Sequence, residues 1–136
     1  MDAREARIQL LEEHRRLRLL VAAADEAAAI LLAGRGDGSV FRVALAELRV
    51  ALASHNDSEE ALLEPLLAGA DAWGPVRVRR MLEEHVAEHL AMRTTLQGDD
   101  VEVAPRMAEL AEDLLAHIEA EERTFLHASV LRERAK

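Results

Sequence analysis

The chain has 136 residues, of which 50% are hydrophobic, and this length suits one compact domain with a sizeable core. It contains no cysteine, which excludes disulfides, thiolate metal sites and cysteine nucleophiles. The formal net charge is −9, with acidic residues along the whole chain, and this disfavours nucleic acids and anionic membranes as partners. We therefore expect a single domain over residues 1–136 that binds no nucleic acid and no membrane.

Glycine and proline divide the chain into four long segments that are rich in alanine and leucine. These segments predict helices near residues 3–33, 40–68, 75–97 and 104–134. No stretch alternates between apolar and polar residues with a period of two, so no strand is predicted. Four helices with short connections predict an all-α fold, an up-down-up-down four-helix bundle.

Several residues mark the expected ends of these helices. Pro75 suits the first turn of the third helix and Pro105 suits the start of the fourth. Ser39 is a candidate cap for the second helix. Pro65 falls inside that helix and is expected to kink it or to end its regular part near Glu64.

Each predicted helix carries an apolar seam with heptad-like spacing, and polar residues interrupt each seam near mid-helix. The last seam, for example, consists of Met107, Leu110, Leu114, His117, Glu121, Thr124, Ala128 and Leu131. The interrupting residues are His14, His55, Glu59, His85, His89, His117 and Glu121. Residues 52–60 and 115–122 also share the pattern His-x-x-x-Glu-Glu, which predicts an approximate internal twofold: the first two helices match the last two.

Five imidazoles and two carboxylates at one level of a bundle predict a metal centre. Burying unpaired carboxylates is costly, although a layer of mutually hydrogen-bonded side chains is an alternative. Nitrogen and oxygen donors without thiolate suit iron, manganese or zinc, and seven donors are too many for one tetrahedral zinc. They fit two ions that share two bridging carboxylates. The expected sets are His85, His89 and His117 for one ion, and His14 and His55 for the other, whose open position suits dioxygen, peroxide or nitric oxide.

The same ordered set resembles the hemerythrin-like proteins over essentially the whole chain. The resemblance implies the hemerythrin four-helix bundle and two iron ions in an oxo- or hydroxo-bridged di-iron centre. That family includes oxygen carriers and stores, oxygen or redox sensors, an iron-sensing domain, and bacterial members that act on peroxide or nitric oxide.

The carboxylate of the last helix departs from the pattern of the animal oxygen carriers in this family. Those proteins place an aspartate five residues after the last histidine, whereas this chain has Glu122 there and Glu121 beside it. Helical geometry favours Glu121, which lies about 40° around the helix from His117, over Glu122 at about 140°. Glu121 is the predicted ligand, and Glu122 is the alternative.

Other polar and aromatic residues receive structural interpretations. The glutamates expected on solvated faces are Glu60, Glu64, Glu84 and Glu88. Glu88 is also a candidate partner for the second N–H of a ligating imidazole. His127 is expected at the surface, and Trp73 is expected to cover one end of the bundle.

The predicted function is that of a non-haem di-iron protein that binds or reduces peroxide, nitric oxide or dioxygen. The alternatives are a reversible dioxygen carrier or store, an iron- or oxygen-sensing module without turnover, and a metal-free helical interaction domain. The sequence leaves open whether the chain is an enzyme with catalase-like, peroxidase-like or nitric-oxide-reducing activity. It also leaves open the electron donor and the choice of manganese over iron.

Residues 1–5 lack the apolar core of a signal peptide, and no apolar run reaches the length of a membrane span. Lys136 is the only lysine, and arginine takes its place elsewhere, a bias typical of high-GC bacteria. We expect a cytoplasmic bacterial protein that is a monomer or a weak homodimer.

Overall fold

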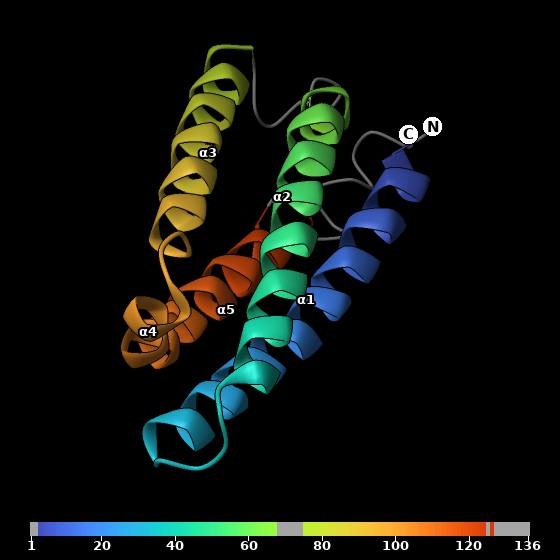
Figure 1. The fold of residues 1–136 in the computed structure, drawn as a ribbon. Helices are drawn as coiled ribbons and strands as arrows, with labels where there is room; N and C mark the ends of the chain where they lie inside the picture. Colours follow the sequence, from blue (N-terminus) through green and yellow to red (C-terminus); the bar gives the residue numbers. More distant parts are fainter. Residues whose placement is uncertain (1–2, 68–74, 125, 127–136) are drawn as a thin grey trace.

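The regular elements are helical throughout the part of the chain that the computed structural model describes, residues 3–67, 75–124 and 126. They are α1 (Ala3–Leu32), α2 (Ser39–Leu67), α3 (Pro75–Thr95), α4 (Asp100–Val103), the 3-10 turn η1 (Ala104–Arg106) and α5 (Met107–Arg123). The long helices alternate in direction along the chain (Figure 1). The predicted all-α, up-down-up-down bundle is confirmed. None of the described helices is both long enough and apolar enough to cross a membrane.

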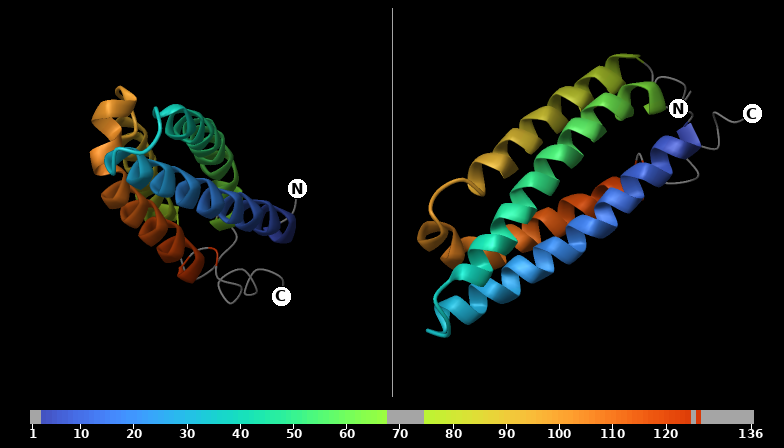
Figure 2. Two further views of the ribbon diagram at one scale, coloured as in Figure 1. Left: turned by 60° about the horizontal axis from the view of Figure 1, so that its bottom comes forward. Right: turned by 45° about the vertical axis from the view of Figure 1, so that its right-hand side comes forward.

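The order of the helices around the bundle is the feature that positions the site. α1 packs against α2 and α5, α2 packs against α3, and α3 contacts α5 in turn. The four long helices therefore form a closed circuit, and each of them has two long neighbours (Figure 2).

The turn before α2 differs from its prediction. The backbone N–H of Arg42 donates to the carbonyl of Gly38, and the N–H of Ser39 donates to the Asp37 carboxylate at 3.0 Å. Ser39 is therefore the first helical residue, and Asp37 is the side chain that caps the helix. The prediction of Ser39 as the cap is wrong because the turn closes one residue earlier on Gly38, whose φ is +84°.

The far end of α2 lies close to its predicted limit at residue 68. The helix continues through Pro65 to Leu67, so its regular part does not end near Glu64, one of the two effects expected of Pro65. Pro65 falls within the last turn of α2. Because proline lacks the backbone N–H, the helix loses only one hydrogen bond there, close to its end.

The last helical segment starts earlier and ends sooner than predicted. The N–H groups of Glu102 and Val103 both donate to the carbonyl of Asp99, which starts the helical path at Asp100 rather than at 104. Pro105 lies within the 3-10 turn that joins α4 to α5. At Thr124 the backbone leaves the helix with φ −105° and ψ −101°, so α5 ends at Arg123. Trp73 and His127 lie outside the described residues.

The interior contains two apolar clusters with a polar layer between them. On α1, His14 lies between Leu10 of one cluster and Leu17 of the other. On α2, Glu59 lies in the same way between Leu52 and Leu63. The apolar seams are therefore interrupted at one level of the bundle, as the sequence predicts.

The seam of α5 is confirmed only in part. Met107, Leu114 and Glu121 are buried as expected, whereas Thr124 is exposed because it lies just past the end of the helix. Ile118 packs into the larger apolar cluster although the predicted seam omits it.

Candidate metal centre

All seven side chains predicted as ligands meet in the polar layer. They form two overlapping groups whose candidate ligand atoms lie within 4.8 Å of one another. One group contains His14, His55, Glu59 and Glu121, and the other contains Glu59, His85, His89, His117 and Glu121. Six of the seven are buried, and the side chain of His117 is 16% exposed. The convergence of the predicted residues is thus a feature of the fold, while their role as ligands belongs to the proposal below.

Helical spacing brings the candidate metal ligands together in pairs. His55 and Glu59 are four residues apart on α2, and their Nε2 and Oε2 atoms are 2.7 Å apart. His117 and Glu121 have the same spacing on α5 and are in direct contact. Residues four apart occupy one face of a helix, so each of these helices presents a histidine and a carboxylate together toward the bundle axis.

Glu59 lies between the two groups of histidines. Its Oε2 is 2.7 Å from Nε2 of His55 and 3.5 Å from Nε2 of His14. Its Oε1 contacts Nε2 of His85 and is 3.3 Å from Nε2 of His89. One carboxylate oxygen therefore faces each group, which is the arrangement that a bridging carboxylate requires.

Glu121 spans the same two groups from the opposite side of the bundle. Its Oε1 contacts His117, and its Oε2 is 3.5 Å from Nε2 of His85 and 3.8 Å from Nε2 of His14. The alternative residue, Glu122, points elsewhere and binds Arg18 through both oxygens at 2.7 and 3.0 Å. The geometry thus supports the choice of Glu121 over Glu122.

The imidazole rings are grouped in the same way as the carboxylate contacts. The ring centroids of His14 and His55 are 4.8 Å apart. Those of His85 and His89 are 4.3 Å apart, and His117 lies 5.2 Å from His85. A pair and a trio of histidines therefore flank the two carboxylates, as the sequence predicts.

Many polar atoms at the centre of the layer have no hydrogen-bond partner, which favours a metal site over a layer of mutually hydrogen-bonded side chains. Buried atoms without a hydrogen-bond partner include Nε2 of His14, His55, His89 and His117, Oε2 of Glu59, and both carboxylate oxygens of Glu121. Buried polar groups without partners are rare in folded proteins, and each needs an explanation. Their concentration at one point, with lone pairs available on nitrogen and oxygen, is typical of a metal site.

The two carboxylates differ in charge when no cation lies between them. Burial alone would raise the pKa of Glu59, but the close imidazoles of His14, His55 and His89 outweigh burial and hold this pKa far below its ordinary value. Burial and the neighbouring Glu59 raise the pKa of Glu121 to about 12. Glu59 is therefore ionised and Glu121 protonated, because two like charges this close do not both form in an apolar interior.

The histidines of the trio are suited to act as ligands near neutral pH. Burial lowers the pKa values of His85 and His117 to about 4. Both imidazoles are therefore neutral at pH 7, which is the protonation state that binds metal ions.

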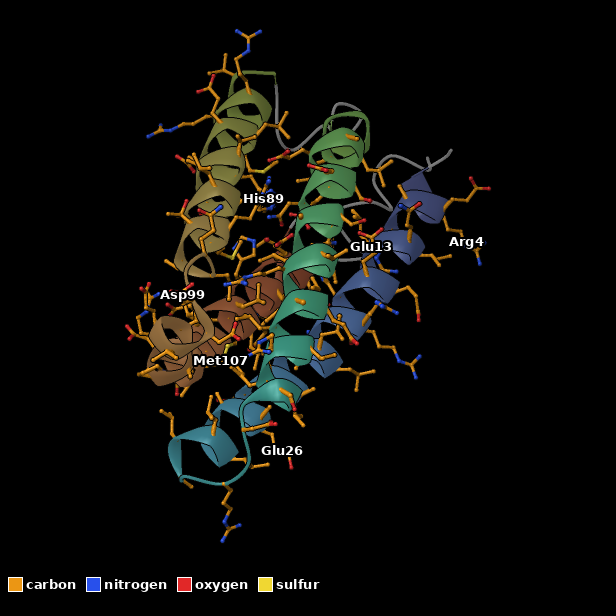
Figure 3. All side chains as sticks on the ribbon, viewed as in Figure 1. Arg4, Glu13, Glu26, His89, Asp99 and Met107 are labelled. Carbon is orange, nitrogen blue, oxygen red and sulfur yellow. The ribbon has the colours of Figure 1, made fainter. Side chains whose placement is uncertain are left out.

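Four further glutamates contact the outer nitrogen, Nδ1, of four of these histidines. Two of the contacts involve α1: Nδ1 of His14 is 2.8 Å from Oε2 of Glu122, and Nδ1 of His55 is 2.7 Å from Oε1 of Glu13. Glu13 lies on α1 where that helix faces α2 (Figure 3).

The other two contacts involve α3. Nδ1 of His89 is 3.1 Å from Oε1 of Glu60, and Nδ1 of His117 is 3.1 Å from Oε2 of Glu88. His89 extends from α3 toward α2 in Figure 3. The suggested role of Glu88 beside a ligating imidazole agrees with this contact. Glu60 keeps part of its predicted solvent exposure, since its side chain is 32% exposed, and its carboxylate also contacts His89.

Asn56 is a buried polar residue that sequence reasoning missed. Its side chain is 1% exposed, and neither its amide nitrogen nor its amide oxygen has a hydrogen-bond partner. The only sequence signal is its place one turn after Leu52 and directly after His55, which puts it near the inner face of α2.

A largely apolar cavity of about 160 Å³ lies between α2, α3 and α5, one helical turn from the site along each helix. Its lining includes Leu52, Met92 and Leu114, each of which lies three residues from a histidine of the polar layer. Thr95 and Asp113 are the polar residues of the lining. The site therefore has a small space beside it that suits small molecules of low polarity.

Comparison with known proteins identifies one family. The family model described as the hemerythrin HHE cation-binding domain matches residues 8–128, which is most of the chain. No curated protein and no solved structure matched the chain.

Proposed function

This chain belongs to the hemerythrin HHE cation-binding family, and from that premise we propose that it is a non-haem di-iron protein that binds or reduces a small oxidant. Family membership and the buried histidine–glutamate cluster make it a metal-binding domain. The observation that carries the proposal is the position of Glu59 and Glu121, both of which face both groups of histidines. Imidazole and carboxylate donors without thiolate suit iron, and they also accept manganese.

Each proposed ligand has a defined role. The trio that would hold one ion is His85, His89 and His117, and the pair that would hold the other is His14 and His55. Glu59 and Glu121 would serve both ions and bring two negative charges to balance them. When bound, the two iron ions supply a pair of redox centres that exchange electrons with an oxidant. The pair contributes one imidazole fewer, so the ion that it would hold would keep a coordination position open for a small ligand.

The surroundings of the site favour a small oxidant over a larger substrate. The adjacent cavity of about 160 Å³ is lined mainly by aliphatic side chains such as Leu52 and Leu114. Such a space suits the neutral gases dioxygen and nitric oxide, which need little hydrogen bonding from the protein, and it is also large enough for hydrogen peroxide. Reversible dioxygen carriage and sensing would use the same site, so turnover is the property that separates these functions.

The test combines metal analysis with spectroscopy of the iron-loaded chain. We expect two irons per chain after desalting, and fewer in His85→Ala and His89→Ala, whereas Glu84→Gln on the exposed face of α3 keeps both. Visible spectra of the anaerobically reduced protein are then recorded before air, after air and after deoxygenation. Bands that persist, together with turnover of peroxide or nitric oxide, support an enzyme. Bands that vanish on deoxygenation support a carrier or store, and a chain that retains no iron contradicts the proposal.

A further inference from the structure

The outer carboxylates form a closed ring around the bundle. Glu13 of α1 contacts the histidine of α2, and Glu60 of α2 contacts one histidine of α3. Glu88 of α3 contacts the histidine of α5, and Glu122 of α5 contacts the histidine of α1. Each long helix thus supplies one carboxylate to a histidine on the next helix, in the same order in which the helices pack.

Each carboxylate of the outer ring is adjacent in the sequence to one of the inner residues of the site, so the two form a two-residue unit. On α1 and α3 the unit is Glu-His, since Glu13 precedes His14 and Glu88 precedes His89. On α2 and α5 it is Glu-Glu, at 59–60 and 121–122. Successive residues are about 100° apart around a helix. When one member of the unit points at the bundle axis, the other therefore points at the neighbouring helix.

The contacts of the ring fix which nitrogen of three imidazoles faces inward. In His14, His55 and His89 the outer contact is a hydrogen bond, and because a carboxylate only accepts, Nδ1 of these three rings carries the proton. The other nitrogen, Nε2, is then left with a lone pair, and in His14, His55 and His89 this Nε2 is buried and directed at Glu59. Imidazoles that bind metals are usually held by a hydrogen bond of this kind from their second nitrogen. Glu88 lies 3.1 Å from Nδ1 of His117 and completes the ring as a close polar contact.

Two of the four ring carboxylates are themselves held by α1. The amide nitrogen of Gln9 donates to Glu13 at 3.0 Å, and the guanidinium of Arg18 holds both oxygens of Glu122. These two carboxylates serve His55 and His14, the pair of histidines on one side of the site. The outer layer is thus ordered by side chains that never reach the site itself.

We propose that these four carboxylates are positioning residues that orient four histidines, and that three of them set the tautomers of His14, His55 and His89 before any metal binds. The members of this positioning ring are Glu13, Glu60, Glu88 and Glu122. The consequence for metal affinity rests on the proposed function, whereas the effect on the tautomers does not. Because each contact crosses to the next helix, the ring also predicts which histidine responds to each substitution.

The first experiment reads the tautomers directly in the metal-free chain. Long-range proton–nitrogen correlation spectra of a chain with ¹⁵N-labelled histidine, at mildly alkaline pH, distinguish Nδ1–H from Nε2–H for each ring. Glu60→Met keeps a similar length but removes the acceptor. It should lower the ratio of Nδ1–H to Nε2–H at His89 about tenfold, the effect of losing one charge-assisted hydrogen bond. Glu13→Met should do the same at His55 alone.

Matched variants separate positioning from general disruption. Glu60→Gln keeps an acceptor oxygen and should restore the Nδ1–H form of His89, while Glu84→Gln and Glu12→Gln alter exposed glutamates and should change no histidine. Circular dichroism checks that each variant remains helical. An unchanged tautomer at His89 in Glu60→Met, or an equal change at every histidine, overturns the proposal.

The second experiment measures the consequence for metal binding. Anaerobic competition for ferrous iron between the protein and a chelator should show an affinity loss of about 10–100-fold in Glu60→Met, a typical cost of removing such a partner. Glu60→Gln should recover part of the loss, and an affinity equal to that of the unsubstituted chain in Glu60→Met overturns this consequence. If the unsubstituted chain binds no iron, the proposed function fails, and the tautomer spectra still decide whether the ring exists.

Discussion

Asn56 combines deep burial with two unsatisfied polar atoms, which makes it a weak point of the metal-free chain. Leucine has the same branched shape without the amide, so Asn56→Leu should raise the free energy of unfolding of the metal-free protein by about 1–3 kcal/mol. Chemical denaturation in the presence of a chelator measures this change. Asp57→Leu, at the exposed position next to it, serves as the control and should change stability by less than about 0.5 kcal/mol. A loss of stability in Asn56→Leu would show that the amide has a partner, such as an ordered water.

Glu121 and Glu122 are adjacent residues with different environments. Substituting each one separately tests which of them is the carboxylate that would serve both ions. Glu121 is 3% exposed and faces both groups of histidines, whereas Glu122 is 24% exposed and binds Arg18. Glu121→Gln should reduce the bound iron below two per chain and abolish the charge-transfer absorption of the loaded protein. Glu122→Gln should keep both irons with weaker affinity, and Glu119→Gln should behave like the unsubstituted chain. The opposite result for Glu121 and Glu122 would make Glu122 the ligand.

The inner residues of the site could be predicted from the sequence, whereas most of the outer residues could not. A histidine in an apolar seam, such as His14, is unexpected on a core-facing position, so it stands out. A glutamate such as Glu60 looks like an ordinary solvated residue, because its role depends on which helix lies beside it. The one available signal is its position directly beside a predicted ligand, which recurs for Glu13, Glu88 and Glu122. That signal becomes meaningful only when the order of the helices around the bundle is known.

At the scale of the elements, the loop between α3 and α4 depends on Gly98. Its φ is +116°, and a Cβ there would lie 2.9 Å from Oε2 of Glu102. Gly36, in the loop before α2, also has a positive φ of +76°, but a Cβ there would meet no atom within 4 Å. Gly36→Ala should therefore cost only the conformational penalty of about 1–2 kcal/mol. Gly98→Ala should lower the free energy of unfolding by more, because its φ lies further from the left-handed region at about +60° that L residues adopt, and the end of Glu102 must also turn away.

Thermal unfolding of the two alanine variants side by side measures the difference. The Gly98 loop also carries a contact between helices, since Arg49 of α2 donates to the carbonyls of Leu96 and Gly98 at 2.7 Å each. A shift of this loop would therefore disturb the packing of α2 against α3, which adds to the cost. Equal destabilisation by Gly36→Ala and Gly98→Ala would contradict this prediction and show that the backbone at Gly98 relaxes without further cost.

The predicted helices agree with the structure where glycine interrupts the pattern and differ where acidic residues begin a helix. Asp99 and Asp100 follow Gly98 and fall between the helices predicted near 75–97 and 104–134. In the structure, Asp100 and Glu102 form the first turn of α4, where negative charge is favourable at a helix N-terminus. The same ambiguity affects Ser39, since serine suits both a cap and a first turn. Local propensity thus indicates that a helix starts but leaves its first residue uncertain by a few positions.

At the scale of the whole molecule, the polar layer makes the stability of the metal-free protein depend on pH in two opposite ways. Burial lowers the pKa values of His85 and His117 to about 4 from 6.5. The unfolded chain therefore binds more protons between these values, and the free energy of unfolding rises as pH increases to 6.5. Glu121 acts in the opposite direction, because burial and Glu59 raise its pKa from 4.5 to about 12. Above pH 4.5, Glu121 keeps a proton in the folded chain that it has lost in the unfolded chain, so its contribution to the free energy of unfolding falls as pH rises.

His55 adds to the decline at alkaline pH. Burial alone would lower its pKa, but the nearby carboxylates of Glu59 and Glu13 outweigh burial and raise it above 6.5. The stability that this interaction provides is present below pH 6.5 and is lost as pH rises through the folded-state value. Above pH 6.5 the His85 and His117 contributions are constant, so only falling contributions from Glu121 and His55 remain. The metal-free chain should therefore be most stable near pH 6.5.

Denaturant unfolding in the presence of a chelator, at a series of pH values from about 5 to 9, measures this profile. Each proton bound by the folded but not the unfolded chain changes the free energy of unfolding by about 1.4 kcal/mol per pH unit. Glu121→Gln removes the titrating carboxyl, so its alkaline decline should be shallower than that of the unsubstituted chain. Iron-loaded protein should show no such decline, because metal binding requires the ionised carboxylate and stabilises it. A metal-free chain whose stability rises between about pH 7 and pH 9 would mean that Glu121 ionises without a cation beside it, and the two carboxylates would then not share one proton.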